Sequence, residues 1–309
     1  MPGEAFALFS ALAFAAASVA VAKGVVHRGG DNGALLSVII TAFSAAGLWL
    51  AFGSPSSLQP TGGPFYRGLA WFAFSGLLTI FLGRNFLYRS IEHLGAIRSS
   101  ALKRLNPLFA VLLGAVILGE VISAVAGAGM LLIVASFGLL LQRSLGALRA
   151  SAPTPAGRMA AETVPRPIGY AYGSGSAFAY SLGYVARRFG LDALPDSNFG
   201  TFVSALAGLA SFGIAALFLK SYRRIVLGVF RYANRWQVVA GVMASAGQLS
   251  QFAAIQRIEV SRVAMISSIE IVLSMIIAVY VLKTERRPDA RTLTVAGLAT
   301  AGVILVAAG

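Results

Sequence analysis

Apolar runs long enough to cross a bilayer recur along the whole chain, separated by short polar stretches rich in Gly, Pro, Ser and cations. A transmembrane helix needs about 20 mostly apolar residues, and the pattern predicts ten of them. The expected segments are residues 5–22, 34–52, 68–91, 98–120, 121–141, 168–185, 199–219, 238–255, 260–282 and 293–308. Glu4 precedes the first segment where a secretory signal would carry cations, so this segment is expected to be a retained helix. The sequence therefore predicts an all-α polytopic membrane protein.

The ten segments form two related groups of five. Residues 142–166 are rich in Arg, Ala, Ser, Thr and Pro, which is typical of a linker, and they separate residues 1–141 from residues 167–309. The halves match at a shift of 164 or 165 positions, pairing Trp71 with Trp236, Gly76 with Gly241 and Glu120 with Glu285. An odd number of spans per half places the second copy upside down. Inverted repeats are expected to bind a ligand at their interface near the midplane.

The cations predict the orientation of the chain in the membrane. Of the 25 Lys and Arg residues, 17 fall in loops on one face, and Arg84, Lys103 and Arg104 fall inside predicted helices. The other face carries Arg67, Arg187, Arg188, Arg257 and Arg262. Short cytoplasmic loops carry the excess of cations, so both termini are expected on the outer, periplasmic side of the inner membrane. The same rule explains the net charge of +14 without nucleic-acid binding.

The segment of residues 98–120 is unusually polar for a transmembrane helix. A Lys or Arg at the centre of a span costs roughly 2.5–3.5 kcal/mol, whereas each Leu, Ile, Val or Phe returns only about 0.3–0.6 kcal/mol. Ser99, Lys103, Asn106 and Ala110 follow helical spacing and share one face. This face is expected to line a water-filled cavity.

Several stretches together resemble a known transporter family. They are RNFLYRSIEHLGAIR from Arg84, NPLF from Asn106 and LGE ending at Glu120, with QFAAIQRIEVS from Gln251, Glu270 and KTE from Lys283 in the second half. The chain resembles the EamA-type exporters of the drug/metabolite transporter superfamily. This resemblance implies two inverted five-helix repeats around a central cavity, with segments 5 and 10 at the periphery, and export of amino acids or other small metabolites.

The chain departs from the family pattern at two places. Ile271 and Val272 stand where a proline often follows the glutamate, and Lys103 with Arg104 is an unusually cationic pair. The family's substrates are therefore not carried over to this chain.

Polar residues inside the predicted helices form the candidate substrate site. Glu270 is the one acidic residue near the middle of a span, and it can act as a counter-ion, a proton carrier, a substrate ligand or part of a structural ion pair. Gln248 and Gln251 can hydrogen-bond a ligand or a neighbouring helix. Glu120 and Glu285 end helices and are interpreted as boundary charges. The candidate set is Arg84, Tyr88, Lys103, Arg104, Asn106, Tyr180, Gln248, Gln251 and Glu270.

The expected function is secondary transport, in the export direction, of a small polar or anionic, amino acid-like metabolite by alternating access. Lys103 and Arg104, with Arg84 nearby, are expected to hold the anionic group, and Glu270 to offset one cation in the empty carrier. Coupling to a proton or a counter-substrate is left open. So is a homodimer, since the Gly-rich segments 5 and 10 suit dimerisation or internal packing.

The alternative is a membrane-embedded lipid-modifying enzyme or a translocator of lipid-linked substrates. An enzyme would need clustered aspartates or histidines, and His27 and His93 are predicted in loops. A receptor or scaffold would not need a charged midplane. The chain has no cysteine and no GxxxxGK[ST] loop, so no thiolate metal site and no ATP binding are expected, and no cofactor is predicted.

Overall fold

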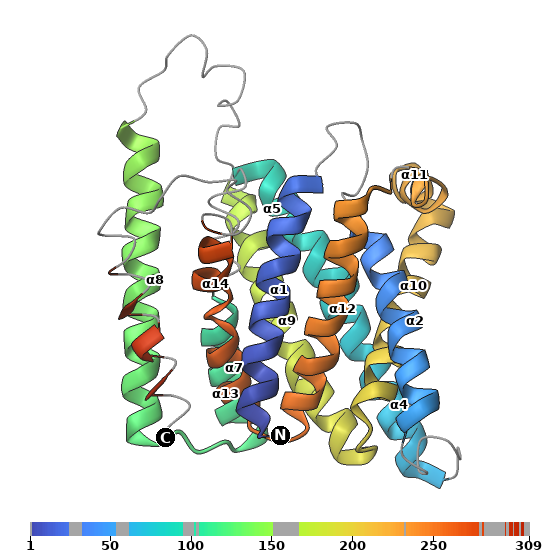
Figure 1. Ribbon diagram of the computed structural model, residues 1–309, viewed down its shortest axis with the longest axis horizontal. Helices are drawn as coiled ribbons and strands as arrows, with labels where there is room; N and C mark the ends of the chain where they lie inside the picture. The colour runs from blue at the N-terminus through green and yellow to red at the C-terminus, as the bar shows by residue number, and fades with distance from the viewer. Residues whose placement is uncertain are drawn as a thin grey trace.

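The computed structural model describes an all-helical bundle (Figure 1). The described residues are 2–24, 33–53, 62–94, 102, 105–150, 167–231, 233–277, 280, 294, 297–298, 300–302 and 304–305. Within them, five helices are long and apolar enough to cross a membrane, at residues 3–21, 34–52, 62–87, 197–218 and 235–255. Shorter apolar helices accompany them, which agrees with a polytopic membrane protein. Helices suit this setting because all their backbone hydrogen bonds lie within one segment.

The first half of the chain begins with two long helices, α1 (Gly3–Gly24) and α2 (Ala34–Phe52). The next helical segment is continuous but changes its winding, from α4 (Gly62–Gly76) through the π-helical turn η1 (Leu77–Gly83) to α5 (Arg84–Leu94). After it come α7 (Asn106–Leu113), the π-helical turn η2 (Gly114–Leu118) and α8 (Ala124–Ala150). Helix α8 stands at the edge of the bundle (Figure 1), as expected for the fifth segment.

The second half begins with α9 (Pro167–Ala193) and α10 (Ser197–Phe218), whose first turn is capped by the Asp196 carboxylate. Helix α11 (Lys220–Gly228) is short and lies across the end of the bundle (Figure 1). It is followed by α12 (Arg235–Ile255), α13 (Val260–Ser267) and α14 (Glu270–Ile276). Most of the predicted tenth segment, residues 293–308, lies outside the described residues.

The two halves are inverted relative to each other. Helix α1 begins at the lower edge of the bundle, whereas α9, the first helix of the second half, ends there (Figure 1). Helix α1 packs along α12, and its counterpart α9 packs along α4, so each half contacts the other in the same way. A side chain on Gly76 would meet Ser204, and one on Gly241 would meet Ile40. These two contacts are related by the shift of 164 or 165 positions that the sequence shows, and glycine at both allows close helix packing.

The segment predicted at residues 98–120 contains α7 and η2, which end before Gly119, whose φ of 68° favours glycine; its residues 98–101, 103 and 104 lie outside the described residues. Two other stretches differ from the sequence prediction. The segment predicted at residues 260–282 is interrupted after Ser267, and α14 starts at Glu270. The cationic stretch after Lys220 was expected to be a loop but contains α11, because Tyr222, Ile225 and Val226 pack against buried residues of the bundle.

Candidate functional site

Arg187 lies in the interior of the protein where the two halves meet. Its side chain is 1% exposed, although it comes from a helix, α9, that predominantly apolar residues form. The guanidinium donates from Nε to Ser75 Oγ at 3.1 Å and from Nη2 to Thr79 Oγ1 at 3.3 Å. A third hydrogen bond, from Nη1 to Gln251 Oε1, measures 2.6 Å. Ser75 and Thr79 belong to the first half and Gln251 to the second, so this one cation links both.

Aromatic rings enclose the same guanidinium. Its central carbon lies 4.5 Å from the centre of the Phe252 ring and 5.2 Å from that of Tyr184. Rings this close attract a cation through their quadrupole, and the attraction grows as water is excluded. The guanidinium is therefore positioned by two ring contacts and by the hydrogen bonds that its N–H groups donate.

Further hydrogen bonds extend the cluster to α7. Tyr184 Oη accepts from Gln251 Nε2 at 3.1 Å and from Asn106 Nδ2 at 3.4 Å. Ser181 Oγ donates toward the Asn106 side-chain oxygen at 2.7 Å. We call the seven residues of this cluster the Arg187 network: Ser75, Thr79, Asn106, Ser181, Tyr184, Arg187 and Gln251.

The charge of Arg187 is not balanced by a carboxylate among the partners that the structure describes. Hydroxyl and amide oxygens accept all three of its hydrogen bonds. Removing a charge from water costs several kcal/mol, and a neutral acceptor repays less of that cost than a carboxylate does. The Arg187 network therefore suits an additional group with negative charge.

Local sequence explains why these side chains converge. Tyr180, Tyr184 and Arg187 follow an i, i+4, i+7 spacing and share one face of α9. Ser75 and Thr79 lie one turn apart, where the chain passes from α4 into η1, and Thr79 Oγ1 also donates to the Ser75 carbonyl oxygen. π-helical turns inside α-helices are frequent at functional sites.

Arg187 and Gln251 lie closer to one end of the bundle, whereas Ser75 lies 13 residues after the start of α4. Arg187 precedes the end of α9 by six residues, and Gln251 precedes the end of α12 by four. At about 1.5 Å per residue, these positions are roughly 6–9 Å from the helix ends. We call this end the Glu4 end, because α1 begins there, and the opposite one the α11 end.

The sequence assigned Arg187 to the loops of the outer face, and this prediction was wrong. The helix extends to Ala193, eight residues beyond the predicted end of the sixth segment, and Arg187 is buried within it. Sequence reasoning also did not include Ser75, Thr79, Ser181 and Tyr184 in the site. The i, i+4, i+7 spacing was the available signal for Tyr184 and Arg187.

The predicted site residues fall into separate groups. Asn106 and Gln251 belong to the Arg187 network. Tyr180 is half-buried and lies against Gly83, one turn from Tyr184. Gln248 is half-buried and lies three residues before Gln251 in α12, outside the contacts that the structure describes for Arg187.

Arg84 and Glu270 lie in other contacts. Arg84 Nη1 donates to the Ala34 carbonyl oxygen at 3.0 Å, at the first residue of α2. Glu270 Oε1 accepts from Ser18 Oγ of α1 at 3.3 Å, so it too joins the two halves. Lys103, Arg104 and the side chain of Tyr88 lie outside the described residues, and the predicted cationic group around Lys103 and Arg104 stays a prediction.

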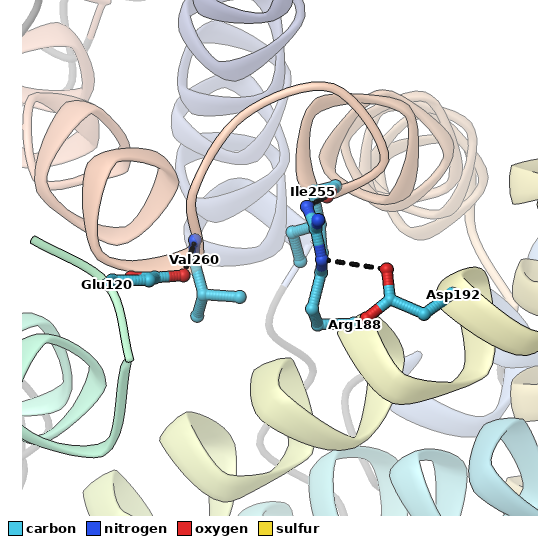
Figure 2. A network of polar contacts seen from close by, with 5 residues as sticks. All are labelled: Glu120, Arg188, Asp192, Ile255 and Val260. Atoms are coloured by element: carbon cyan, nitrogen blue, oxygen red, sulfur yellow. Dashed lines mark hydrogen bonds and ion pairs between the residues drawn. The ribbon is translucent and has the colours of Figure 1, made fainter. Parts of the chain in front are cut away.

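Glu120 has a structural role that the sequence interpretation as a boundary charge did not include. Its carboxylate accepts from the backbone N–H groups of Val260 at 2.7 Å and Ser261 at 3.0 Å, and from Ser261 Oγ. Figure 2 shows it facing the start of α13. A carboxylate at a helix N-terminus satisfies free N–H groups and complements the helix dipole. Through these hydrogen bonds, Glu120, which follows η2 in the first half, contacts the start of α13 in the second half.

Two ion pairs lie at the same end of the bundle. Arg262 pairs with Glu4 at 3.4 Å, which connects α13 with the start of α1. Arg188 pairs with Asp192 at 3.0 Å and donates to the Ile255 carbonyl oxygen at the end of α12, as Figure 2 shows. The Glu120 and Arg262 contacts join the two halves at this end, whereas the Arg188 contacts lie within the second half.

Across the described residues, no group of three or more His, Asp or Glu side chains is placed to hold a metal ion. The Arg187 network instead offers a cation, hydroxyls and amides. Such groups bind and orient a polar or anionic solute by hydrogen bonding.

Comparisons with known proteins agree with this architecture. A crystal structure of another protein matches with a TM-score of 0.67 over 98% of this chain and 95% of its own, at 18% identity, which shows a shared fold. No curated protein matches the chain. The sequence model of the EamA-like transporter family matches residues 1–142 and 167–308. Since these two stretches cover most of the sequence, the protein belongs to the EamA-like transporter family and is a multi-pass membrane transporter.

Proposed function

We propose that this transporter is a secondary exporter of a small polar or anionic metabolite, and that it works by alternating access. The observation that carries the proposal is the Arg187 network, in which a buried cation of the second half is hydrogen-bonded to Ser75 and Thr79 of the first half. In an inverted-repeat transporter the substrate binds where the repeats meet. Export, rather than uptake, rests on the family resemblance.

The contacts between the halves suit a protein that opens and closes. Ser10 Oγ of α1 donates to the Gly247 carbonyl oxygen at 2.8 Å, and Thr41 and Ser245 share a hydrogen bond of 2.9 Å. A neutral hydrogen bond contributes only about 0.5–1.5 kcal/mol net, because water replaces it when it breaks. The halves are thus joined by contacts that water can replace one by one as they separate.

The proposed orientation places the α11 end in the cytoplasm. Lys220, Arg223 and Arg224 of α11 are exposed there. Short cytoplasmic loops carry the excess of Lys and Arg, and neighbouring carboxylates change this preference little. Arg187 and Gln251 then lie in the outer half of the inner membrane.

Metabolite efflux tests the transport proposal. Cells that overproduce the protein should accumulate one or a few solutes in the medium, relative to cells that carry the empty vector. Purified protein in liposomes should then exchange the labelled solute without ATP and without changing it chemically. Chemical conversion of the solute would favour the membrane-embedded enzyme, and the absence of any solute-specific efflux or exchange would refute transport.

A further inference from the structure

Each nitrogen of the Arg187 guanidinium makes one hydrogen bond, but a guanidinium has five N–H groups. One N–H on each terminal nitrogen therefore has no acceptor among the partners that the structure describes. A carboxylate accepts two hydrogen bonds from one guanidinium in a planar, bidentate arrangement. These two N–H groups, together with the one on Nη1 that Gln251 occupies, can serve a carboxylate once the Gln251 oxygen is displaced.

The charge of the network sets the charge of the group that it can take. Arg187 contributes one positive charge, and its described partners Ser75, Thr79, Gln251 and Tyr184 are neutral. One carboxylate brings this buried site to neutrality, whereas a phosphate monoester would leave it with an excess of negative charge. Burying an excess of either sign is costly. The network thus favours a group with a single negative charge.

From these observations we propose that Arg187 binds the carboxylate of the transported solute, and that the Gln251 side-chain oxygen occupies the carboxylate's place while the carrier is empty. The inference rests on the proposed transport function and deepens it by naming the substrate class. It differs from the sequence prediction, which gave this role to Lys103 and Arg104.

The contacts of Arg187 indicate how a solute carboxylate replaces the Gln251 amide. The amide of Gln251 bridges Arg187 and the Tyr184 hydroxyl, donating to Tyr184 and accepting from Arg187. When a carboxylate arrives, the amide rotates away, and the carboxylate accepts from Arg187. The rings of Phe252 and Tyr184 keep the guanidinium in plane during the exchange. A neutral amide or ester of the same solute offers a weaker acceptor and no charge.

The first test needs only the unmodified protein. The solutes that overproducing cells release above the empty-vector level are identified by mass spectrometry and sorted by whether they carry a free carboxylate. The proposal requires that each does. Release of solutes that lack a free carboxylate overturns it while leaving transport itself established, and release of nothing refutes the proposed function instead.

The second test uses Arg187→Met with Arg188→Met as the matched control. Arg188 is the next residue in the same helix, but it pairs with Asp192 outside the Arg187 network. Liposomes containing each variant are compared for exchange of the carboxylate solute found in the first test, at equal protein content. We expect Arg187→Met to lower the exchange rate by about tenfold or more, as for the loss of a charge-assisted bidentate contact, and Arg188→Met to stay within about twofold.

Arg187→Lys tests whether the positive charge alone is sufficient or the planar guanidinium is also needed. Lys keeps the charge but lacks the planar fork, so exchange should fall between Arg187→Met and the unmodified protein. Exchange by Arg187→Met at the unmodified rate and affinity overturns the proposal. If Arg187→Met fails to assemble, Arg187→Lys and the presence or absence of a free carboxylate on the released solutes decide the question.

Discussion

The side-chain oxygen of Gln251 accepts a hydrogen bond of 2.6 Å from the buried guanidinium of Arg187. A neutral amide thus stands where a carboxylate is the usual partner of a buried cation. An amide carries an NH2 group where a carboxylate carries its second oxygen. Because the amide is neutral, it does not balance the positive charge of Arg187.

Gln251→Glu should convert this contact into an internal ion pair. We expect the variant to fold and to be at least as thermally stable as the unmodified protein, because the new carboxylate balances Arg187 without a change in volume. Exchange of a carboxylate solute should fall by about tenfold or more, since the solute must now displace a charged competitor. The measurements are thermal unfolding in detergent and exchange in liposomes. Exchange at the unmodified rate would show that Arg187 does not contact the solute.

Tyr184→Phe should weaken the network without changing its charge. The variant removes the hydroxyl that accepts from Gln251 and Asn106, and it leaves the buried Gln251 amide and the half-buried Asn106 amide without this acceptor. An unsatisfied buried donor costs about 1–3 kcal/mol, so the midpoint of thermal unfolding should fall. Tyr170→Phe is the control, because Tyr170 is 43% exposed near the start of α9. Equal unfolding midpoints for the two variants would contradict the described bonding.

Gly76→Ala should separate two helices of opposite halves. A methyl group there would overlap the backbone carbonyl of Ser204 in α10, which cannot rotate away. Overpacking of this kind costs about 1–3 kcal/mol. Gly213→Ala is the matched control in α10, where an added methyl group meets nothing within 4 Å, and it should be neutral or slightly stabilising. Thermal unfolding of both variants distinguishes close packing from a general effect of alanine.

Glu120→Gln should loosen the Glu4 end of the bundle. It removes the charge that caps α13, and a cost of about 1–2 kcal/mol changes the ratio of closed to open forms by a factor of roughly 5–30. The chain has no cysteine, so one reporter cysteine at the fully buried Ala7 can be labelled specifically. An impermeant maleimide should label Ala7→Cys faster when Glu120→Gln is present.

Glu4→Gln provides the comparison for this experiment. It breaks the partly exposed pair with Arg262, and exposed pairs contribute only about 0–1 kcal/mol. Its effect on labelling should therefore be smaller than that of Glu120→Gln. Identical labelling of all three proteins would mean that the Glu120 contact does not hold this end closed.

The proposed topology is tested by reporter fusions. A fluorescent protein that matures only in the cytoplasm should stay dark when it is fused after Gly309. The same reporter fused to a chain truncated after Gly228, at the end of α11, should be bright, because the cations of this region are proposed to face the cytoplasm. The reverse result would invert the orientation and place Arg187 and Gln251 in the inner half of the membrane.

The sequence predicted the class of fold because lipid imposes a simple pattern on it. Long apolar runs, a repeat at 164 or 165 positions and the motifs around Arg84 and Asn106 predicted an all-helical membrane transporter of EamA type, and the family match confirms it. The division at residues 142–166 and the export direction stay predictions. So does the assignment of solute binding to the nine candidate residues.

Contacts between distant segments account for what the sequence did not show. An arginine near the end of an apolar run is normally a boundary charge, and Arg187 differs only because Ser75 and Thr79, 112 and 108 positions away, lie opposite it. Glu120 likewise takes its role from Val260 and Ser261 in the other half. The interruption before Glu270 has no proline or glycine to mark it, so helical periodicity continued through it.

The internal repeat relates the two backbones but not their chemistry. At the shift of 164 or 165 positions, Lys23 corresponds to Arg187 and Glu270 to Asn106, but Ala240 and Ala244 correspond to Ser75 and Thr79, Ala20 to Tyr184, and Phe86 to Gln251. The repeat therefore keeps a cation at both places but keeps its hydroxyl and amide partners in only one. A carrier built from two equivalent copies would present the same site to either compartment. Here the two halves contribute different side chains to the proposed site, so the inward-open and outward-open states would surround the solute differently.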